Sequence, residues 1–169
     1  MFQVHADSLE TYFEFDPERR VELEMVDGLI RRVAPGLRRY FHQGTPAGQA
    51  GMRMKMIGYG QFPYAISSGK QTVWPVIGLA LQRNYISLYF AVTLDSRPIV
   101  ALYADRLGAF RAGRNNFSFE RFPDLNVDVL EALVAVPKSS RLSPTIPPAT
   151  SKLRGGPKSL ASAPCRRTG

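Results

Sequence analysis

Residues 54–92 decide the fold, and they read MKMIGYGQFPYAISSGKQTVWPVIGLALQRNYISLYFAV. Apolar runs of strand length are separated here by Gly, Ser and Asn, which is typical of consecutive antiparallel strands. The last run alternates: Ile86, Leu88 and Phe90 share one face, while Ser87 and Tyr89 take the other. We therefore expect an antiparallel sheet with one apolar face.

Helical patterns lie on both sides of this stretch. Asp16-Pro17 is typical of a helix start, and the helix is expected to run to Val33. A shorter helix is expected over 8–13, opened by a capping box that starts at Asp7, and a last helix is capped by Asn126. The sequence thus predicts an α+β domain: a curved antiparallel sheet of about five to six strands, with N-terminal and C-terminal helices packed on one face.

The phase of the long helix follows from its apolar residues. At 100° per residue one arc is apolar and is expected to face the sheet. That arc holds Val21, Met25, Val26, Leu29, Ile30 and Val33, and the opposite side holds Arg20, Glu24, Asp27 and Arg31. Glu22 falls within the apolar arc, which has two interpretations. Either the first turn of the helix extends beyond the sheet edge and leaves Glu22 in solvent, or its carboxylate is directed at a cation or a partner.

Two features between the helices bear on the sheet. Met52, Met54 and Met56 alternate with bases, which favours a half-buried strand over a ligand site. Pro63 and Pro75 each lack a ladder donor and are expected at edges, strand ends or bulges.

The positive charge is concentrated at the C-terminal end. The chain of 169 residues has a net charge of +8, yet residues 138–169 hold seven bases and no acid. Residues 1–28 hold eight acids against two bases, and residues 1–137 sum to only +1. We expect one domain over 1–137 and a disordered basic tail over 138–169, whose only binding role would be weak, salt-sensitive attraction to polyanions.

The location is expected to be cytoplasmic. Cys165 is the single cysteine, which precludes an intrachain disulfide and suits a reducing compartment. The N-terminus carries acids where a signal peptide needs bases, and no apolar run approaches ~20 residues.

Catalytic signatures are lacking in the sequence. Gly58-Tyr59-Gly60 begins like a dinucleotide fingerprint, but Pro63 stands at its third glycine. His5 and His42 are far apart and have no acidic partner at helical spacing. We therefore expect a protein that is not an enzyme and has no certain cofactor.

Several sequence blocks resemble a known family. In the family's order they are Met56–Gly60, Trp74–Leu79, Gln82–Tyr89, Tyr103–Gly108 and Leu125–Leu130. They resemble the YdhG-like domain-of-unknown-function family over about residues 8–135. This resemblance implies the α+β arrangement above, and one branch of the family is regarded as a frataxin-like iron chaperone. On that reading the metal ligands would be Glu18, Glu22 and Glu24, the cofactor iron, and the partners iron–sulfur assembly proteins.

A second function uses the aromatic residues of the sheet. Tyr59, Trp74 and Arg114 are the candidate ligand-binding residues of a module for a small organic ligand or a partner protein. Stacking of nucleic acid on the sheet aromatics is a weaker interpretation, because aromatic residues are also what strands use for cross-strand packing.

Overall fold

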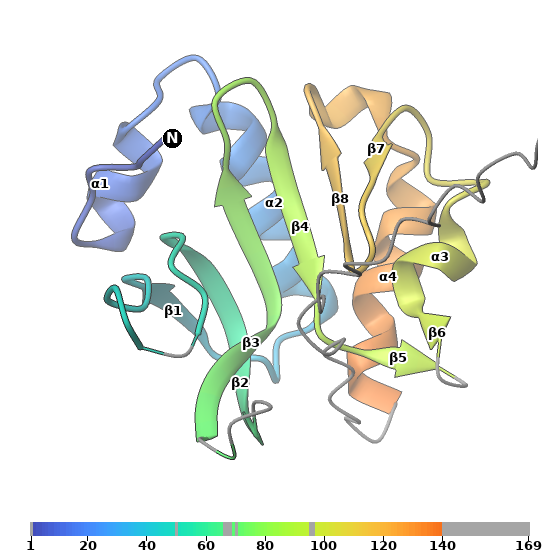
Figure 1. The fold of residues 1–169 in the computed structure, drawn as a ribbon. Coiled ribbons are helices and arrows are strands. Elements are labelled where there is room, and N and C mark those ends of the chain that lie inside the picture. The colour runs from blue at the N-terminus through green and yellow to red at the C-terminus, as the bar shows by residue number, and fades with distance from the viewer. Residues whose placement is uncertain (1, 50, 66–68, 70, 95–96, 140–169) are drawn as a thin grey trace, which may run out of the picture.

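The computed structural model describes residues 2–49, 51–65, 69, 71–94 and 97–139. A six-stranded sheet in the order β1-β2-β3-β4-β8-β7 forms the centre, with a small β5-β6 pair beside it (Figure 1). Every strand pairing is antiparallel. The strands are β1 Arg39–His42, β2 Met56–Ala65, β3 Gln71–Leu81, β4 Ile86–Phe90, β5 Thr93–Leu94, β6 Arg97–Pro98, β7 Arg111–Ala112 and β8 Asn116–Phe119.

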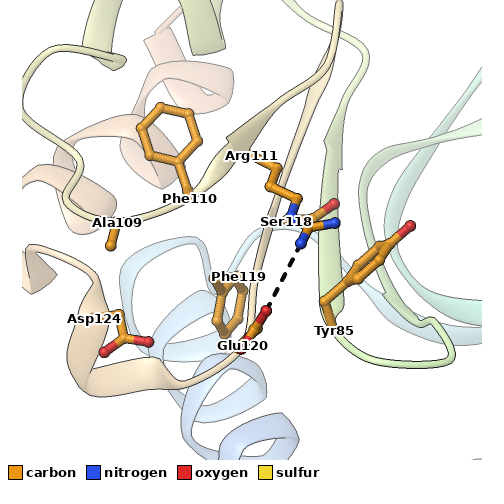
Figure 2. Close-up of a pocket in the computed structure, with 8 residues that line it drawn as sticks. All are labelled: Tyr85, Ala109, Phe110, Arg111, Ser118, Phe119, Glu120 and Asp124. Carbon is orange, nitrogen blue, oxygen red and sulfur yellow. Dashed lines mark ion pairs between the residues drawn. The ribbon is translucent and has the colours of Figure 1, made fainter.

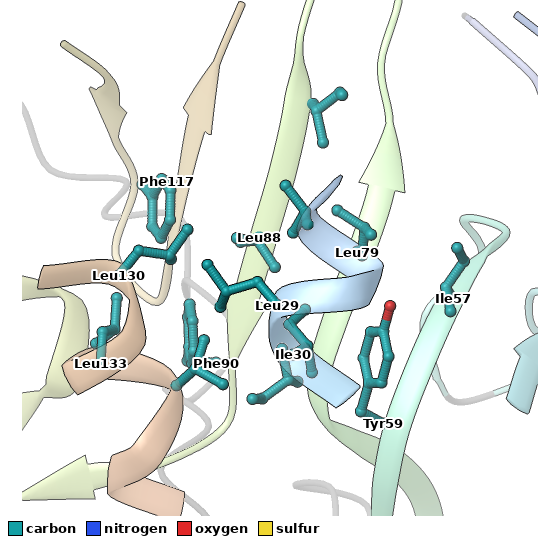
Figure 3. Packing of buried hydrophobic residues seen from close by; sticks show 14 of the residues in the cluster. Leu29, Ile30, Ile57, Tyr59, Leu79, Leu88, Phe90, Phe117, Leu130 and Leu133 are labelled. Atoms are coloured by element: carbon teal, nitrogen blue, oxygen red, sulfur yellow. The ribbon is translucent and has the colours of Figure 1, made fainter. Parts of the chain in front are cut away.

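The two longest helices cover one face of this sheet. The helices are α1 Leu9–Glu14, α2 Arg20–Val33, α3 Ile99–Tyr103, η1 Phe122–Asp124 and α4 Val127–Ser139. Figure 1 shows α2 and α4 together behind the sheet. Leu29 and Ile30 of α2 pack above Leu79 and Leu88, and α4 adds further leucines beside Phe117 (Figure 3). The α+β class and the one-sided helix packing are confirmed.

The helix starts differ from the prediction, while the last cap is confirmed. Ser8, not Asp7, caps α1 by accepting a hydrogen bond from the Thr11 amide. Asp16 does cap a turn, since its Oδ1 accepts from the Arg19 amide at 3.2 Å, but α2 begins only after that turn. Asn126 Oδ1 accepts from the Val129 amide at 3.3 Å, as expected at the start of α4.

The predicted phase of α2 is wrong in its first half. Val21 is 62% exposed and Met25 45% exposed, whereas Leu23 is buried and Asp27 is only 5% exposed. Asp27 can be buried because its carboxylate is paired: Oδ1 accepts from Tyr59 Oη and Oδ2 from Arg39 Nη1, each at 2.7 Å. This network rotates the helix so that a charged residue faces β1 and β2.

The β2–β3 ribbon extends past its neighbours. β1 pairs with β2 only over 56–59, and β4 pairs with β3 only over 77–81. Pro63 and Pro75 both lie beyond these ranges, where the outer edge of each strand carries no partner strand, as predicted. The expected strand around Met52 and Met54 is wrong, because β2 begins at Met56.

Tyr12 of α1 completes the ladder where β2 begins. Its hydroxyl accepts a hydrogen bond from the Leu81 amide at 2.8 Å and donates to the Lys55 carbonyl at 3.2 Å. The phenol therefore stands where a direct bond between two strands would be, and it ties the N-terminal segment to the sheet.

Two predictions from the sequence concern other parts of the chain. The basic tail falls almost wholly within residues 140–169, outside the described residues. None of the helices in the described part of the chain is long and apolar enough to cross a membrane.

A candidate ligand-binding cleft

The side of the sheet away from α2 and α4 is here called the open face. Cross-strand pairing places one row of residues on it: Tyr40, Gly58, Gly78, Tyr89 and Asn116. The Tyr40 ring lies directly on Gly58, where an added Cβ would stand 2.4 Å from a ring carbon. Met56 Sδ covers Gly78 in the same way, at 2.7 Å. The half of the open face over β1, β2 and β3 is thus closed by its own side chains.

The half over β4 and β8 is polar. Ser87 and Ser118 are directly paired and buried, and their hydroxyls are 2.8 Å apart. Tyr89 lies next to them, and burial raises the pKa of its hydroxyl. The two serines are small and bond to each other, and from this pair the open face continues to the β7 edge of the sheet.

A cleft of about 270 Å³ opens at that edge (Figure 2). It is lined by Tyr85, Ala109, Phe110, Arg111, Ser118, Phe119, Glu120 and Asp124. Figure 2 shows Tyr85 on one side and Phe110 and Asp124 on the other, with Arg111 and Glu120 between them. The lining therefore brings together three aromatic rings, one guanidinium and two carboxylates.

Arg19, the N-cap of α2, and Glu22 in its first turn fix two walls of this cleft. Arg19 Nη1 donates to the carbonyls of Gln82 at 2.5 Å and Tyr85 at 3.1 Å, which holds the β3–β4 turn. Glu22 Oε2 accepts a hydrogen bond from the Phe122 amide at 2.5 Å, at the start of η1. Because η1 ends at Asp124, the start of α2 and its N-cap residue together position both sides of the cleft.

The third wall depends on a glycine. Gly108 has a φ of +108°, and a Cβ there would lie 2.3 Å from the Asp124 carbonyl oxygen. The close approach lets the Ala109 amide donate to that same oxygen at 2.9 Å. Segment 108–111 is thereby held against η1 before it enters β7.

Two of the charged side chains of the cleft, Arg111 and Glu120, form an ion pair with each other. The Arg111 guanidinium carbon is 5.7 Å from the centroid of the Tyr85 ring, and Arg111 Nη2 is 4.0 Å from Glu120 Oε1. The Arg111 and Glu120 side chains are 74% and 66% exposed, so this ion pair is weak. Asp124 is exposed as well.

The predicted ligand-binding residues are not brought together. Tyr59 is fully buried beneath α2, where its hydroxyl bonds to Asp27, and it does not reach the surface. Trp74 is half-buried in β3 opposite Phe62 and packs against the core. Arg114 is exposed in the turn between β7 and β8.

The predicted metal ligands are also apart. Glu22 bonds to the Phe122 amide, Glu24 pairs with Arg20 at 2.7 Å, and Glu18 is exposed in the turn before α2. Within the described ranges, no three His, Cys, Asp or Glu side chains are grouped so as to hold a metal ion. Iron binding stays a prediction from the sequence. Of the two interpretations of Glu22, neither names its actual contact, a backbone amide.

The residues of the cleft were not recognised as a site in the sequence. In the sequence Tyr85 is one of several strand aromatics, and no motif includes Arg111 or Asp124. One usable signal was the strand alternation around 117–120, which places Ser118 and Glu120 opposite the apolar face. The register that sets Glu120 near Arg111 and Tyr85 has no such signal.

No family model, curated protein or solved structure matches the chain. The resemblance to the YdhG-like family therefore stays a prediction.

Proposed function

We propose that the chain is a non-catalytic binding module that holds a small organic group, free or carried by a partner protein, in the cleft at the β7 edge. The observation that supports this is the lining itself. An accessible tyrosine ring, an apolar wall from Phe110 and Phe119 and charged groups converge on one hollow. Convergence of apolar surface with a few polar groups is what orients ligands in binding sites.

The lining favours binding over chemistry. Ser118 shares its hydrogen bond with Ser87, whereas an activated nucleophile needs a base within hydrogen-bond reach. The charged side chains of the cleft are exposed, and water weakens the electrostatic stabilisation that catalysis relies on. The proposed role is therefore recognition.

The size of the cleft limits the ligand. Its volume of about 270 Å³ is slightly below the range of roughly 300–1,000 Å³ that is usual for drug-sized ligands. One side chain or a comparably small molecule suits it better than a nucleotide cofactor.

We also propose that the protein is cytoplasmic, as expected from the single cysteine and the acidic N-terminus.

A fragment titration followed by NMR tests the proposal. The full chain, labelled with ¹⁵N, is titrated with small neutral, anionic and cationic fragments. We expect some of them to shift the amide signals of Tyr85 and of residues 109–111 and 118–120. The variant Tyr85→Leu should lose those shifts. Tyr103→Leu is the matched control, since Tyr103 carries a similar cation–π contact outside the cleft, with Arg106 at 5.6 Å. Shifts confined to other regions, or none with any fragment class, would refute the proposal.

A further inference from the structure

The cleft already contains one guanidinium group, that of Arg111. It stacks on the Tyr85 ring and approaches Glu120, as Figure 2 shows. The chain itself therefore demonstrates which chemical group this surface accommodates. The contact is loose, because the Arg111 side chain is 74% exposed and its ion pair measures 4.0 Å.

Resting on the proposed binding function, we propose that the ligand is a cationic guanidinium or alkylammonium group, and that it binds by displacing Arg111 from Tyr85 and Glu120. The incoming cation stacks on the Tyr85 ring and pairs with the carboxylates of Glu120 and Asp124. Arg111 then turns out into solvent, where its charge is fully hydrated.

The charge balance of the cleft supports a cation. Its two carboxylates outnumber the single guanidinium, and Figure 2 shows Asp124 across the cleft from Tyr85. None of the ion pairs between described residues includes Asp124, so its carboxylate is available. An anionic ligand would meet both carboxylates at short range, which disfavours it.

The aromatic rings favour a guanidinium over a compact ammonium. A planar guanidinium stacks on an aromatic face and can bond a carboxylate through two N–H groups, whereas an ammonium acts as a point charge. The methylene stem of an arginine also suits the apolar wall of Phe110 and Ala109. We therefore expect arginine to bind more tightly than lysine.

A set of matched probes tests the ligand class on the full chain. N-acetyl-arginine amide is compared by NMR titration with N-acetyl-citrulline amide, which has nearly the same shape and no charge. We expect arginine to bind about fivefold or more tightly, and this difference should shrink as salt is added. Agmatine and a capped Gly-Gly-Arg-Gly-Gly peptide separate two sources of the cation. Tighter binding of the peptide indicates a partner protein's side chain, and equal binding indicates a free small molecule.

Three variants test the mechanism. Glu120→Gln should weaken arginine binding by roughly two- to fivefold, as expected for an exposed pair. Arg111→Ala should strengthen it by a similar factor, because the internal competitor is gone. Tyr103→Leu should leave it unchanged.

The outcomes separate this inference from the proposed function. Equal affinity of citrulline and arginine amides, or weaker binding by Arg111→Ala, would overturn the cation proposal while leaving a binding cleft in place. If no fragment of any charge shifts the signals of the cleft, both proposals fail together.

Discussion

The hydroxyl of Tyr59 offers the sharpest test of how the core is held together. It donates to Asp27 Oδ1 at 2.7 Å, between α2 and β2, and both residues are buried. Burial, and next the charge of Asp27, raise the pKa of the Tyr59 hydroxyl well above its usual value. The phenol is therefore a permanent donor at neutral pH, and Tyr59→Phe removes that donor without removing the ring.

The size of the loss follows from the contacts. A hydrogen bond to a charged group contributes about 1.5–3 kcal/mol. Asp27 keeps its bond from Arg39 Nη1 at 2.7 Å, so we expect a loss of about 2 kcal/mol for Tyr59→Phe. With a urea m-value of about 2 kcal/mol/M for a domain of this size, the unfolding midpoint should fall by about 1 M.

A second tyrosine provides the control. Tyr40 lies half-buried on the open face, and the polar side chain beside its hydroxyl is that of Gln61, which is exposed and neutral. Tyr40→Phe should therefore cost under about 1 kcal/mol. A double-mutant cycle of Tyr59→Phe with Asp27→Asn then isolates the pair. If Tyr59→Phe costs no more than Tyr40→Phe, the buried carboxylate does not depend on the phenol and the reasoning is refuted.

Three further changes test other parts of the structure. Tyr12→Phe leaves the Leu81 amide without its acceptor and should cost about 1–3 kcal/mol in urea unfolding, with m unchanged. In Gly108→Ala the new Cβ would sit on a backbone with positive φ and against a backbone oxygen, so the variant should lose about 2–4 kcal/mol of unfolding free energy. Gly28→Ala, on the open surface of α2, is the control and should leave the stability unchanged or raise it. Burial raises the pKa values of the Tyr12 and Tyr59 hydroxyls in the folded protein, so the unfolded chain, with a tyrosine pKa of 10, releases those protons first. The stability that the two protonated hydroxyls contribute is therefore complete below pH 10 and is lost as the pH rises above it. The free energy of unfolding from urea titrations should thus fall above that pH, by up to about 2.7 kcal/mol per pH unit from these two groups, and Tyr59→Phe should flatten the slope.

The fold could be predicted where local patterns repeat. Alternation in residues 86–90 places Leu88 in the core and Tyr89 on the other face, which the structure confirms. The phase of α2 could not be predicted, because its buried face includes Asp27. Its two closest partners, Arg39 and Tyr59, come from strands later in the chain, while Arg31 of the same helix adds a longer ion pair at 3.8 Å.

The cleft was harder to predict for the same reason. Its lining comes from four separate segments, and no spacing within any of them marks a site. Glu22 illustrates the difficulty, since its position in an apolar arc did single it out. Its role, however, is set by the Phe122 amide a hundred residues later.

The two prolines of the β2–β3 ribbon limit how copies of this protein can associate with one another at high concentration. A strand of a second copy that approached the outer edge of β2 or β3 would find a pyrrolidine ring where it needs an amide hydrogen, at Pro63 or Pro75. Growth of intermolecular sheets from these two flanks is thereby blocked, although the ribbon is long and extends past its neighbours. An exposed arm of this kind would otherwise be a starting point for fibrils.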